Sequence, residues 1–262
     1  VFILIGIISL LVSVMAWLLV RNRPEDYGHK PVLVHKVEDN DHTVSIFRKL
    51  GKVIANKRLW PGFIVNFGSS GGLYAFMGLW AVPYLRDVHN MTRNEASIYV
   101  TLLIAGFAVG AMSWGSISDW LRNRKLVISF ALLVYLGCWL ILILAGWPAT
   151  VPGAWLLCFF MGLGGSGFFL TMPNAKEISH PGFSGIAVAA VNVGTFLGVA
   201  IIQPLFGKVL DSVWNGKLID GVRVYSESAY KTGFILLLVL GLSSLLAVVF
   251  MQETRCRNIF HL

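Results

Sequence analysis

Charged residues are scarce in this sequence of 262 residues. Asp, Glu, Lys and Arg make up only 13% of it, whereas globular domains average about 25%. A water-soluble chain of this length would have too few charges to cover its surface. The hydrophobic residues, 56% of the total, gather in runs of roughly 20, the length at which a helix crosses about 30 Å of hydrocarbon. The sequence therefore predicts an all-α protein that crosses a membrane several times.

Cysteine is also rare, and the three that occur do not form a recognisable site. Cys138 and Cys158 lie inside apolar runs and Cys256 lies near the C-terminus. Their spacing fits neither a metal-binding pattern nor a disulfide framework, so we interpret them as small packing residues. The sequence also contains no recognisable pairing of a nucleophile with a base. We therefore expect no enzymatic activity, no metal and no cofactor.

Ionisable residues are missing from the middle of the apolar runs. Asp, Glu, Lys, Arg and His do not occur in 60–84, 97–118, 126–146, 154–172 or 185–207. Charged residues inside a membrane mark proton relays and binding sites for ionic substrates. We therefore expect any carboxylate that couples proton movement to lie outside this sequence.

The apolar runs divide the chain into one isolated span and a group of six. We predict spans at about 2–20, 60–84, 95–118, 126–146, 154–173, 185–210 and 231–251. The corresponding regions are a single helix (1–20), a linker (21–59), a six-helix bundle (60–252) and a tail (253–262). Thr92 and Glu95 have the spacing of a capping box before the third span. Glycines at 106, 110 and 162–167 predict close helix contacts. The chain opens inside an apolar run and without Met, so we expect a fragment of a longer protein.

The end of the linker has the pattern of an amphipathic helix, over residues 43–59. Apolar residues recur there at helical spacing, with basic residues between them: Ile46, Phe47, Leu50, Val53 and Ile54, and Arg48, Lys49, Lys52 and Lys57. This pattern favours a helix that lies in the membrane interface. The alternative is a partner-binding helix of the kind that calmodulin recognises.

The net charge of +8 indicates topology rather than nucleic-acid binding, because the basic residues lie in loops between the spans. Short loops rich in Lys and Arg stay in the cytoplasm. If the linker 21–59 is inside, the inside segments hold fifteen bases and the outside segments six. We therefore expect a multi-pass protein of the cell (inner) membrane, with its linker and C-terminus in the cytoplasm.

Four segments together resemble the major facilitator superfamily. The hinge Gly115-x-x-x-Asp119-x-x-x-Asn123-Arg124-Lys125 resembles that family's loop signature G-x-x-x-D-R-x-G-R-[RK], with Trp120 and Asn123 as departures. The exit 23–28 resembles the end of the sixth helix in the bacterial organic-anion and sugar-phosphate branches. The tail 253–257 resembles the E-T-[KR]-G-[KR] segment after the twelfth helix, with a cysteine in place of its glycine. The segment 79–87 looks like the end of the seventh helix.

The resemblance implies that the chain runs from the sixth helix to the C-terminus of a secondary transporter. Such a transporter moves a small organic solute by rocking two six-helix halves about a central site, so the N-terminal half would be the missing partner. The hinge would act as a gating latch, formed by Gly115, Asp119, Arg122, Arg124 and Lys125. In that role Asp119 would accept hydrogen bonds at a facing helix N-terminus, and the bases would pair with acids or lipid headgroups. Alternatively, Asp119 is a solvated helix end and the bases only set topology.

The resemblance also indicates which spans face the solute. The first and fifth spans of the six-helix unit would line the cavity, and their polar residues are the candidates: Asn66, Ser70, Tyr74, Asn192, Thr195 and Gln203. For each of these, an interhelical hydrogen bond is the competing interpretation. The sugar-phosphate antiporters of the family use an arginine in each half, and this half has none at depth, which argues against a phosphate ester.

Two other functions fit parts of the pattern. The first is a solute sensor of the same fold that signals to a partner protein, for which the basic helix at 43–59 would be a contact surface. The second is a seven-helix receptor, but no span carries a lysine that could hold retinal as a Schiff base. We therefore expect a transporter, with the sensor as the alternative.

Overall fold

The computed structural model describes residues 2–20, 28, 46–219 and 221–260. The chain divides into two compact units, Val1–Thr43 and Val44–Leu262. The described part of the first unit is α1 (Phe2–Leu19), an apolar helix of 18 residues. Its last residues precede the linker, most of which lies outside the described residues.

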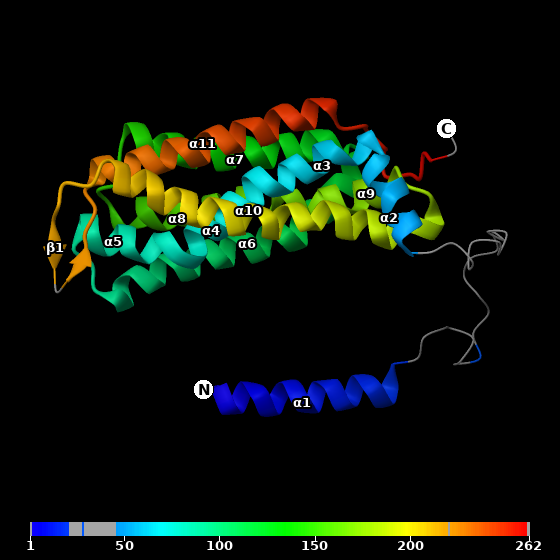
Figure 1. The fold of residues 1–262 in the computed structure, drawn as a ribbon, viewed down its shortest axis with the longest axis horizontal. Coiled ribbons are helices and arrows are strands. Elements are labelled where there is room, and N and C mark those ends of the chain that lie inside the picture. Colours follow the sequence, from blue (N-terminus) through cyan, green and yellow to red (C-terminus); the bar gives the residue numbers. More distant parts are fainter. Residues whose placement is uncertain (1, 21–27, 29–45, 220, 261–262) are drawn as a thin grey trace. The chain divides into compact units, whose positions relative to one another are not determined.

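The second unit is a bundle whose long helices alternate in direction (Figure 1). Its α-helices are α2 (Ile46–Ala55), α3 (Trp60–Val65), α4 (Gly71–Ala75), α5 (Ala81–His89), α6 (Arg93–Leu121), α7 (Arg124–Leu144), α8 (Val151–Gly165), α9 (Thr171–Glu177), α10 (Ser184–Ser212) and α11 (Glu227–Phe250). Short 3₁₀ turns are η3 (Lys57–Leu59), η6 (Ser166–Leu170) and η7 (Pro181–Phe183). The predicted all-helical membrane architecture is confirmed.

Five helical segments of the described chain are long and apolar enough to cross a membrane: Arg93–Leu121, Arg124–Leu144, Val151–Glu177, Pro181–Ser212 and Glu227–Phe250. Residues 60–89 also follow a helical course, but two π-helical turns, η4 (Asn66–Ser70) and η5 (Phe76–Trp80), interrupt it. The count of seven spans remains a prediction, because α1 is shorter than these five helices and residues 60–89 do not form one continuous α-helix.

Local sequence signals define the ends of several helices. The Thr92 N–H donates to Glu95 Oε2 at 2.8 Å and the Glu95 N–H donates to Thr92 Oγ1 at 3.3 Å, so the predicted capping box opens α6. The polar loop between the last two long helices contains a small hairpin, β1 (Leu218–Ile219) and β2 (Val222–Arg223). Strands of two residues are too short to show an alternating pattern, which explains why the sequence did not predict them.

Close contact between α6 and α8 depends on glycine. A Cβ atom on Gly106 would overlap the carbonyl oxygen of Phe159, and one on Gly162 would overlap that of Leu103. The predicted close approach at these glycines is therefore present. This packing fixes the orientation of α6 on α8, and therefore the direction in which the opposite face of α6 points.

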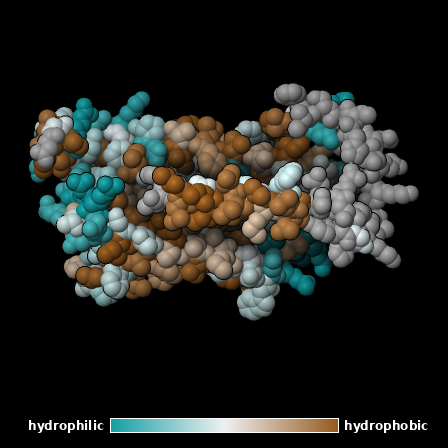
Figure 2. Space-filling view, turned by 90° about the horizontal axis from the view of Figure 1, so that it is seen from below, coloured by the Kyte–Doolittle hydropathy of each residue, from teal (hydrophilic) through white to brown (hydrophobic). Residues whose placement is uncertain are grey.

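The surface has the polarity of a membrane protein. Figure 2 shows hydrophilic residues gathered at the left end of the bundle and apolar residues on the helices in view. The exposed apolar residues include Ile104 and Met112 on α6 and Phe196 on α10, which are 48%, 82% and 67% exposed. Such residues need a covering of lipid or protein.

Candidate solute site and basic-end network

A cluster of four buried polar side chains joins three segments of the bundle. Asn66 Nδ2 donates to Thr171 Oγ1 at 2.6 Å, and Thr195 Oγ1 donates to Asn66 Oδ1 at 3.0 Å. The hydroxyls of Ser70 and Thr195 lie 2.8 Å apart. All four residues are buried, so the cluster ties the helical course 60–89 to α9 and α10.

The cluster lies at the π turn η4. Asn66 Nδ2 also donates to the Gly62 carbonyl at 2.8 Å, and the Ser70 hydroxyl donates to the Asn66 carbonyl at 2.6 Å. A π turn shifts the residues after it around the helix, and such turns are frequent at functional sites. The regular spacing of Asn66, Ser70 and Tyr74 therefore does not keep all three on one face.

Tyr74 faces a different neighbourhood, made of aromatic rings. Its ring centroid lies 5.6 Å from that of Phe107 on α6 and 6.1 Å from that of Phe168 in η6, and the rings of Phe107 and Phe169 lie 5.5 Å apart. Tyr74, Phe107 and Phe169 are half-buried, and we call these three the aromatic surface. Tyr74 and Phe107 are central in the segments 60–89 and Arg93–Leu121, so this surface lies at mid-depth. Neither phenylalanine was predicted as a site residue, because aromatic residues are ordinary in apolar spans.

The candidates from α10 are separated from one another. Thr195 belongs to the buried cluster, whereas Asn192 and Gln203 are half-buried outside it. The Gln203 carbonyl accepts a hydrogen bond from Trp80 Nε1 at 3.2 Å. The structure thus brings Asn66, Ser70 and Thr195 together and places Tyr74, Asn192 and Gln203 elsewhere.

The hinge residue Arg124 is the centre of a network at one end of the bundle. Its side chain is only 7% exposed, and its guanidinium nitrogens lie 2.7 Å from Asp119 Oδ1 and 2.7 Å from Glu177 Oε1. Arg124 Nη1 also donates to Ser118 Oγ at 3.1 Å. A buried charge needs such partners, and here they come from the ends of α6 and α9.

Glu253 in the tail occupies the N-terminus of α7. Its carboxylate accepts from the backbone N–H of Arg124 at 3.1 Å and of Lys125 at 2.8 Å. The positive end of a helix dipole stabilises an anion at this place. The sequence predicted this kind of contact for Asp119, at a helix outside this chain; within the described structure Asp119 pairs with Arg124 of the same hinge.

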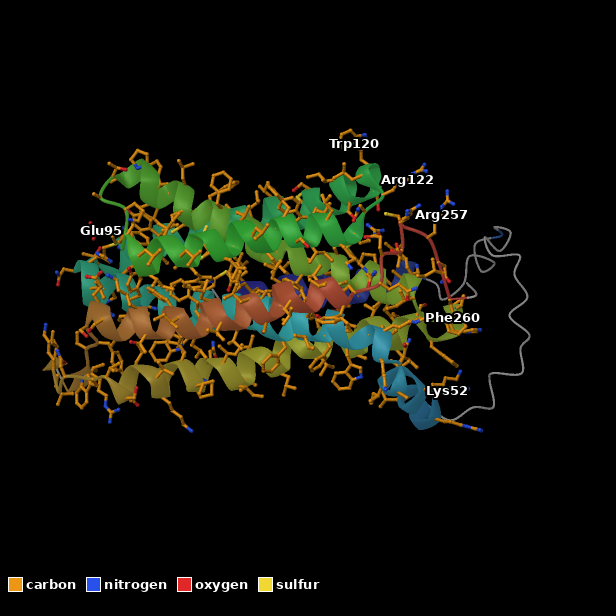
Figure 3. The ribbon with its side chains drawn as sticks, turned by 90° about the horizontal axis from the view of Figure 1, so that it is seen from above. Lys52, Glu95, Trp120, Arg122, Arg257 and Phe260 are labelled. Atoms are coloured by element: carbon orange, nitrogen blue, oxygen red, sulfur yellow. The ribbon has the colours of Figure 1, made fainter. Side chains whose placement is uncertain are left out.

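The other hinge residues point in different directions. Lys125 Nζ donates to the Val249 carbonyl at 2.8 Å. Arg122 is exposed and ends α6 with a φ of 49°, and Figure 3 shows it beside Trp120 at the outside of the bundle. A Cβ on Gly115 would meet no atom within 4 Å. The Gly115 side of α6 is therefore open in the described structure.

The tail after α11 packs onto the same network. Thr254 Oγ1 donates to Glu177 Oε2, the Ile259 N–H donates to the Glu177 carbonyl at 2.9 Å, and Asn174 Nδ2 donates to the Gln252 carbonyl at 2.9 Å. Thr254 is 2% exposed. The tail motif is recognisable in the sequence, but these contacts are not predictable from it, because they join residues far apart in the chain.

Comparison with known proteins assigns the chain to a family. The model of the Major Facilitator Superfamily matches residues 1–203 and 62–257. The chain belongs to the Major Facilitator Superfamily. It is therefore a multi-pass membrane protein of a transporter family rather than an enzyme.

Superfamily members with known structures share this fold. The chain superposes on the outward conformation of the transporter FucP with a TM-score of 0.66 and 17% sequence identity, over 97% of this chain and 54% of that one. On a single-substitution variant of the Escherichia coli fucose:proton symporter FucP, the TM-score is 0.59 at 16% identity, over 80% of this chain and 46% of that one. At these identities the likeness establishes the fold alone.

Curated relatives are distant and longer. An Ascochitine biosynthesis cluster MFS transporter of Didymella fabae is 26% identical over 76% of this chain and 36% of its own length. Dityrosine transporter 1 of Saccharomyces cerevisiae is 22% identical over 69% of this chain and 30% of its own length. The putative uncharacterized transporter YgaY of Escherichia coli is 23% identical over 58% of this chain and 38% of its own length. The matched part is thus about a third of each relative.

Proposed function

We propose that the chain is the C-terminal portion of a secondary transporter that moves a small organic solute across the cell membrane by alternating access. The observation that carries this proposal is the aromatic surface, Tyr74, Phe107 and Phe169. It lies at mid-depth, it is half-buried, and it belongs to a bundle with the transporter fold. Substrate sites of this class of transporter lie near the bilayer midplane between two repeats.

The partner of this bundle would be a second, N-terminal half. The matched part is only a third of the length of the curated relatives, which leaves room for such a half. The open side of α6 at Gly115 and the exposed apolar residues of α6, Ile104 and Met112, suit a helical neighbour. We place the interface between the halves on α6.

The chemistry of the aromatic surface favours a solute without strong charge. No ionisable side chain lies at mid-depth in the apolar runs of the bundle, so this half offers no counter-ion at that depth. Aromatic rings bind flat apolar groups and sugar faces, and the Tyr74 hydroxyl adds one hydrogen-bonding group. An uncharged or weakly polar organic molecule fits this surface better than a phosphate ester does.

The buried polar cluster of Asn66, Ser70, Thr171 and Thr195 has a supporting role in this proposal. Its hydrogen bonds are made within the bundle, so a solute would have to displace them in order to bind. We assign to it the relative placement of the 60–89 segment and α10. Asn192 and Gln203, which are half-buried, remain candidates for solute contact.

The Arg124 network would belong to the cytoplasmic gate. The described end that carries it holds eleven bases and three acids: Arg48, Lys49, Lys52, Lys57, Arg58, Arg122, Arg124, Lys125, Lys176, Arg255 and Arg257, with Asp119, Glu177 and Glu253. The opposite end holds six bases and four described acids: Arg86, Arg93, Lys208, Lys217, Arg223 and Lys231, with Asp87, Glu95, Asp211 and Glu227. This asymmetry favours the cytoplasm for the Arg124 end.

Uptake measurements test the transporter proposal. The full-length protein in proteoliposomes would be offered a panel of labelled solutes that pairs uncharged sugars and aromatic compounds with their phosphorylated or carboxylated forms. We expect saturable uptake of an uncharged member and none of the phosphorylated ones. A phosphate ester as the best substrate would contradict the proposed solute class. Binding of a solute without uptake would favour the sensor of the same fold.

A further inference from the structure

A groove at the basic end of the bundle lies apart from the aromatic surface and from the Arg124 network. It lies between α2, the start of α3 and α10, and its volume is about 240 Å³. Its walls are apolar, with Leu50 and Ile54 from α2, Trp60 and Phe63 from α3, and Val193 from α10. We infer that this groove binds one anionic phospholipid, with an acyl chain in the groove and the phosphate among the basic residues of α2 and η3.

The apolar walls of the groove indicate that the part of the ligand inside it is a hydrocarbon chain. Ile54, Trp60 and Val193 are 52%, 46% and 55% exposed, so the groove is open along one side. Helix α2 is nonetheless held in place, because Val53 and Leu59 are buried at 4% and 5% in a cluster with Val191 of α10. A fixed, open, apolar groove suits a hydrocarbon chain that enters from the bilayer.

The basic residues explain the charge of the ligand. Lys52 directly precedes Val53, while Lys57 and Arg58 directly precede the groove residues Leu59 and Trp60. All three bases are exposed, and in the part of the chain that the structure describes no acid pairs with them. Lys52 Nζ lies 5.6 Å from the ring centroid of Phe183, just before α10. These charges therefore remain available to a phosphate group.

Trp60 places the groove at the level of the headgroups. Its Nε1 donates to the Ile54 carbonyl at 3.1 Å, which joins the end of α2 to the start of α3. Tryptophan concentrates at the membrane–water interface, and Figure 3 places Lys52 at the end of the bundle that also holds Arg122 and Arg257. An acyl chain in the groove would therefore bring its headgroup to the bases without leaving its natural depth.

Native mass spectrometry of the full-length protein in mild detergent tests this inference, with added phosphatidylglycerol or phosphatidylcholine of identical chains. We expect one phosphatidylglycerol to be retained at concentrations where phosphatidylcholine is lost. A base near an anionic headgroup contributes roughly fivefold in affinity, so Lys52→Gln/Lys57→Gln/Arg58→Gln should weaken retention by on the order of a hundredfold. The matched control, Arg86→Gln/Lys208→Gln/Lys217→Gln at the other end, should have no effect. Equal retention of both lipids, or equal loss in both variants, would overturn the inference.

A second pair of variants separates the groove from general surface attraction. Val193→Trp fills the groove, whereas Val239→Trp adds the same bulk on α11 at a residue that is also 55% exposed. We expect only Val193→Trp to reduce retention. In addition, phosphatidylglycerol brominated on its acyl chain should quench a larger fraction of the tryptophan fluorescence in the wild type than in Trp60→Phe, because Trp60 lines the groove. Equal quenching would mean that another part of the protein covers the groove, and the inference would be wrong.

Discussion

Arg124 and Glu177 form an ion pair with a distance of 2.7 Å between Nη2 and Oε1, although 53 residues separate them in the chain. Glu177 also accepts from Thr254 of the tail. The pair thus connects the hinge after α6 with the end of α9 and with the C-terminal segment. Any movement of this end must either keep these three elements together or break the bonds among them.

Glu177→Gln should release the tail. A hydrogen bond to a charged group contributes about 1.5–3 kcal/mol, so we expect the tail to be undocked roughly 10- to 100-fold more often. Cys256 reports this, because its Sγ lies 3.5 Å from the Ser118 carbonyl while Cys138 and Cys158 are buried. Its alkylation rate should rise in Glu177→Gln. Asp211→Asn, which removes the ion pair of Arg223 at the opposite end, is the control and should leave the rate unchanged.

The pH dependence of Cys256 alkylation is an independent test of the contact between Glu177 and the tail. Burial raises the pKa of the Cys256 thiol, and only the thiolate reacts. The wild-type alkylation rate should therefore still be rising with pH above about 8.5, the ordinary cysteine value. In Glu177→Gln the profile should shift to lower pH. An unchanged profile in that variant would show that the tail is not held through Glu177.

Gly162→Ala should destabilise the bundle. The added methyl would overlap the Leu103 carbonyl on α6, and overpacking of this kind costs about 1–3 kcal/mol. Gly137→Ala is a matched control, because a Cβ there meets nothing within 4 Å. We expect a lower thermal unfolding temperature in detergent for Gly162→Ala alone. Equal temperatures for the two variants would contradict the close packing of α6 on α8.

The buried polar cluster and the aromatic surface should respond differently to substitution. Thr195→Val removes the hydroxyl that bonds Asn66 and Ser70 and should cost about 1.2 kcal/mol, from an average of about 0.6 kcal/mol for each such bond in membranes, with little change in the KM for the solute. Tyr74→Leu should instead raise KM by roughly two- to tenfold, since a stacked aromatic contact contributes about 0.5–1.5 kcal/mol beyond burial. Unfolding curves and uptake kinetics separate the two. A raised KM in Thr195→Val would place the cluster in the solute site.

Gly115→Leu tests the interface between the two halves. Within this chain the new side chain has free space, so the bundle itself should fold normally. If another half packs on this side of α6, the leucine will obstruct its approach and uptake will fall. Normal expression, a normal unfolding temperature and full uptake together would place the interface elsewhere.

Much of the architecture could be predicted from sequence, because the thickness of the bilayer fixes how long an apolar helix must be. The capping box at Thr92 and the glycine contacts of α6 follow from local spacing in the same way. The site was harder to predict. Asn66 and Ser70 do lie close to Thr195, but the π turn at Asn66–Ser70 directs Tyr74 toward Phe107, and no spacing rule anticipates that turn.

The contacts of Arg124 were also hard to predict from the sequence. The sequence singled out Asp119 and the bases of the hinge, yet two of the acids that hold the backbone and side chain of Arg124 lie 53 and 129 residues away. Glu253, rather than Asp119, occupies the helix N-terminus. Pairings between distant residues depend on how the helices pack, and a single sequence carries little information about that.

Two-sided labelling at mid-depth tests the central claim most directly. Phe107→Cys, in full-length protein that also carries Cys256→Ser, would be exposed to a membrane-impermeant maleimide from either side of proteoliposomes. We predict that the cysteine reacts from both sides and that a transported solute slows both reactions. Labelling from one side only, or labelling that no solute affects, would contradict a central cavity walled by the aromatic surface.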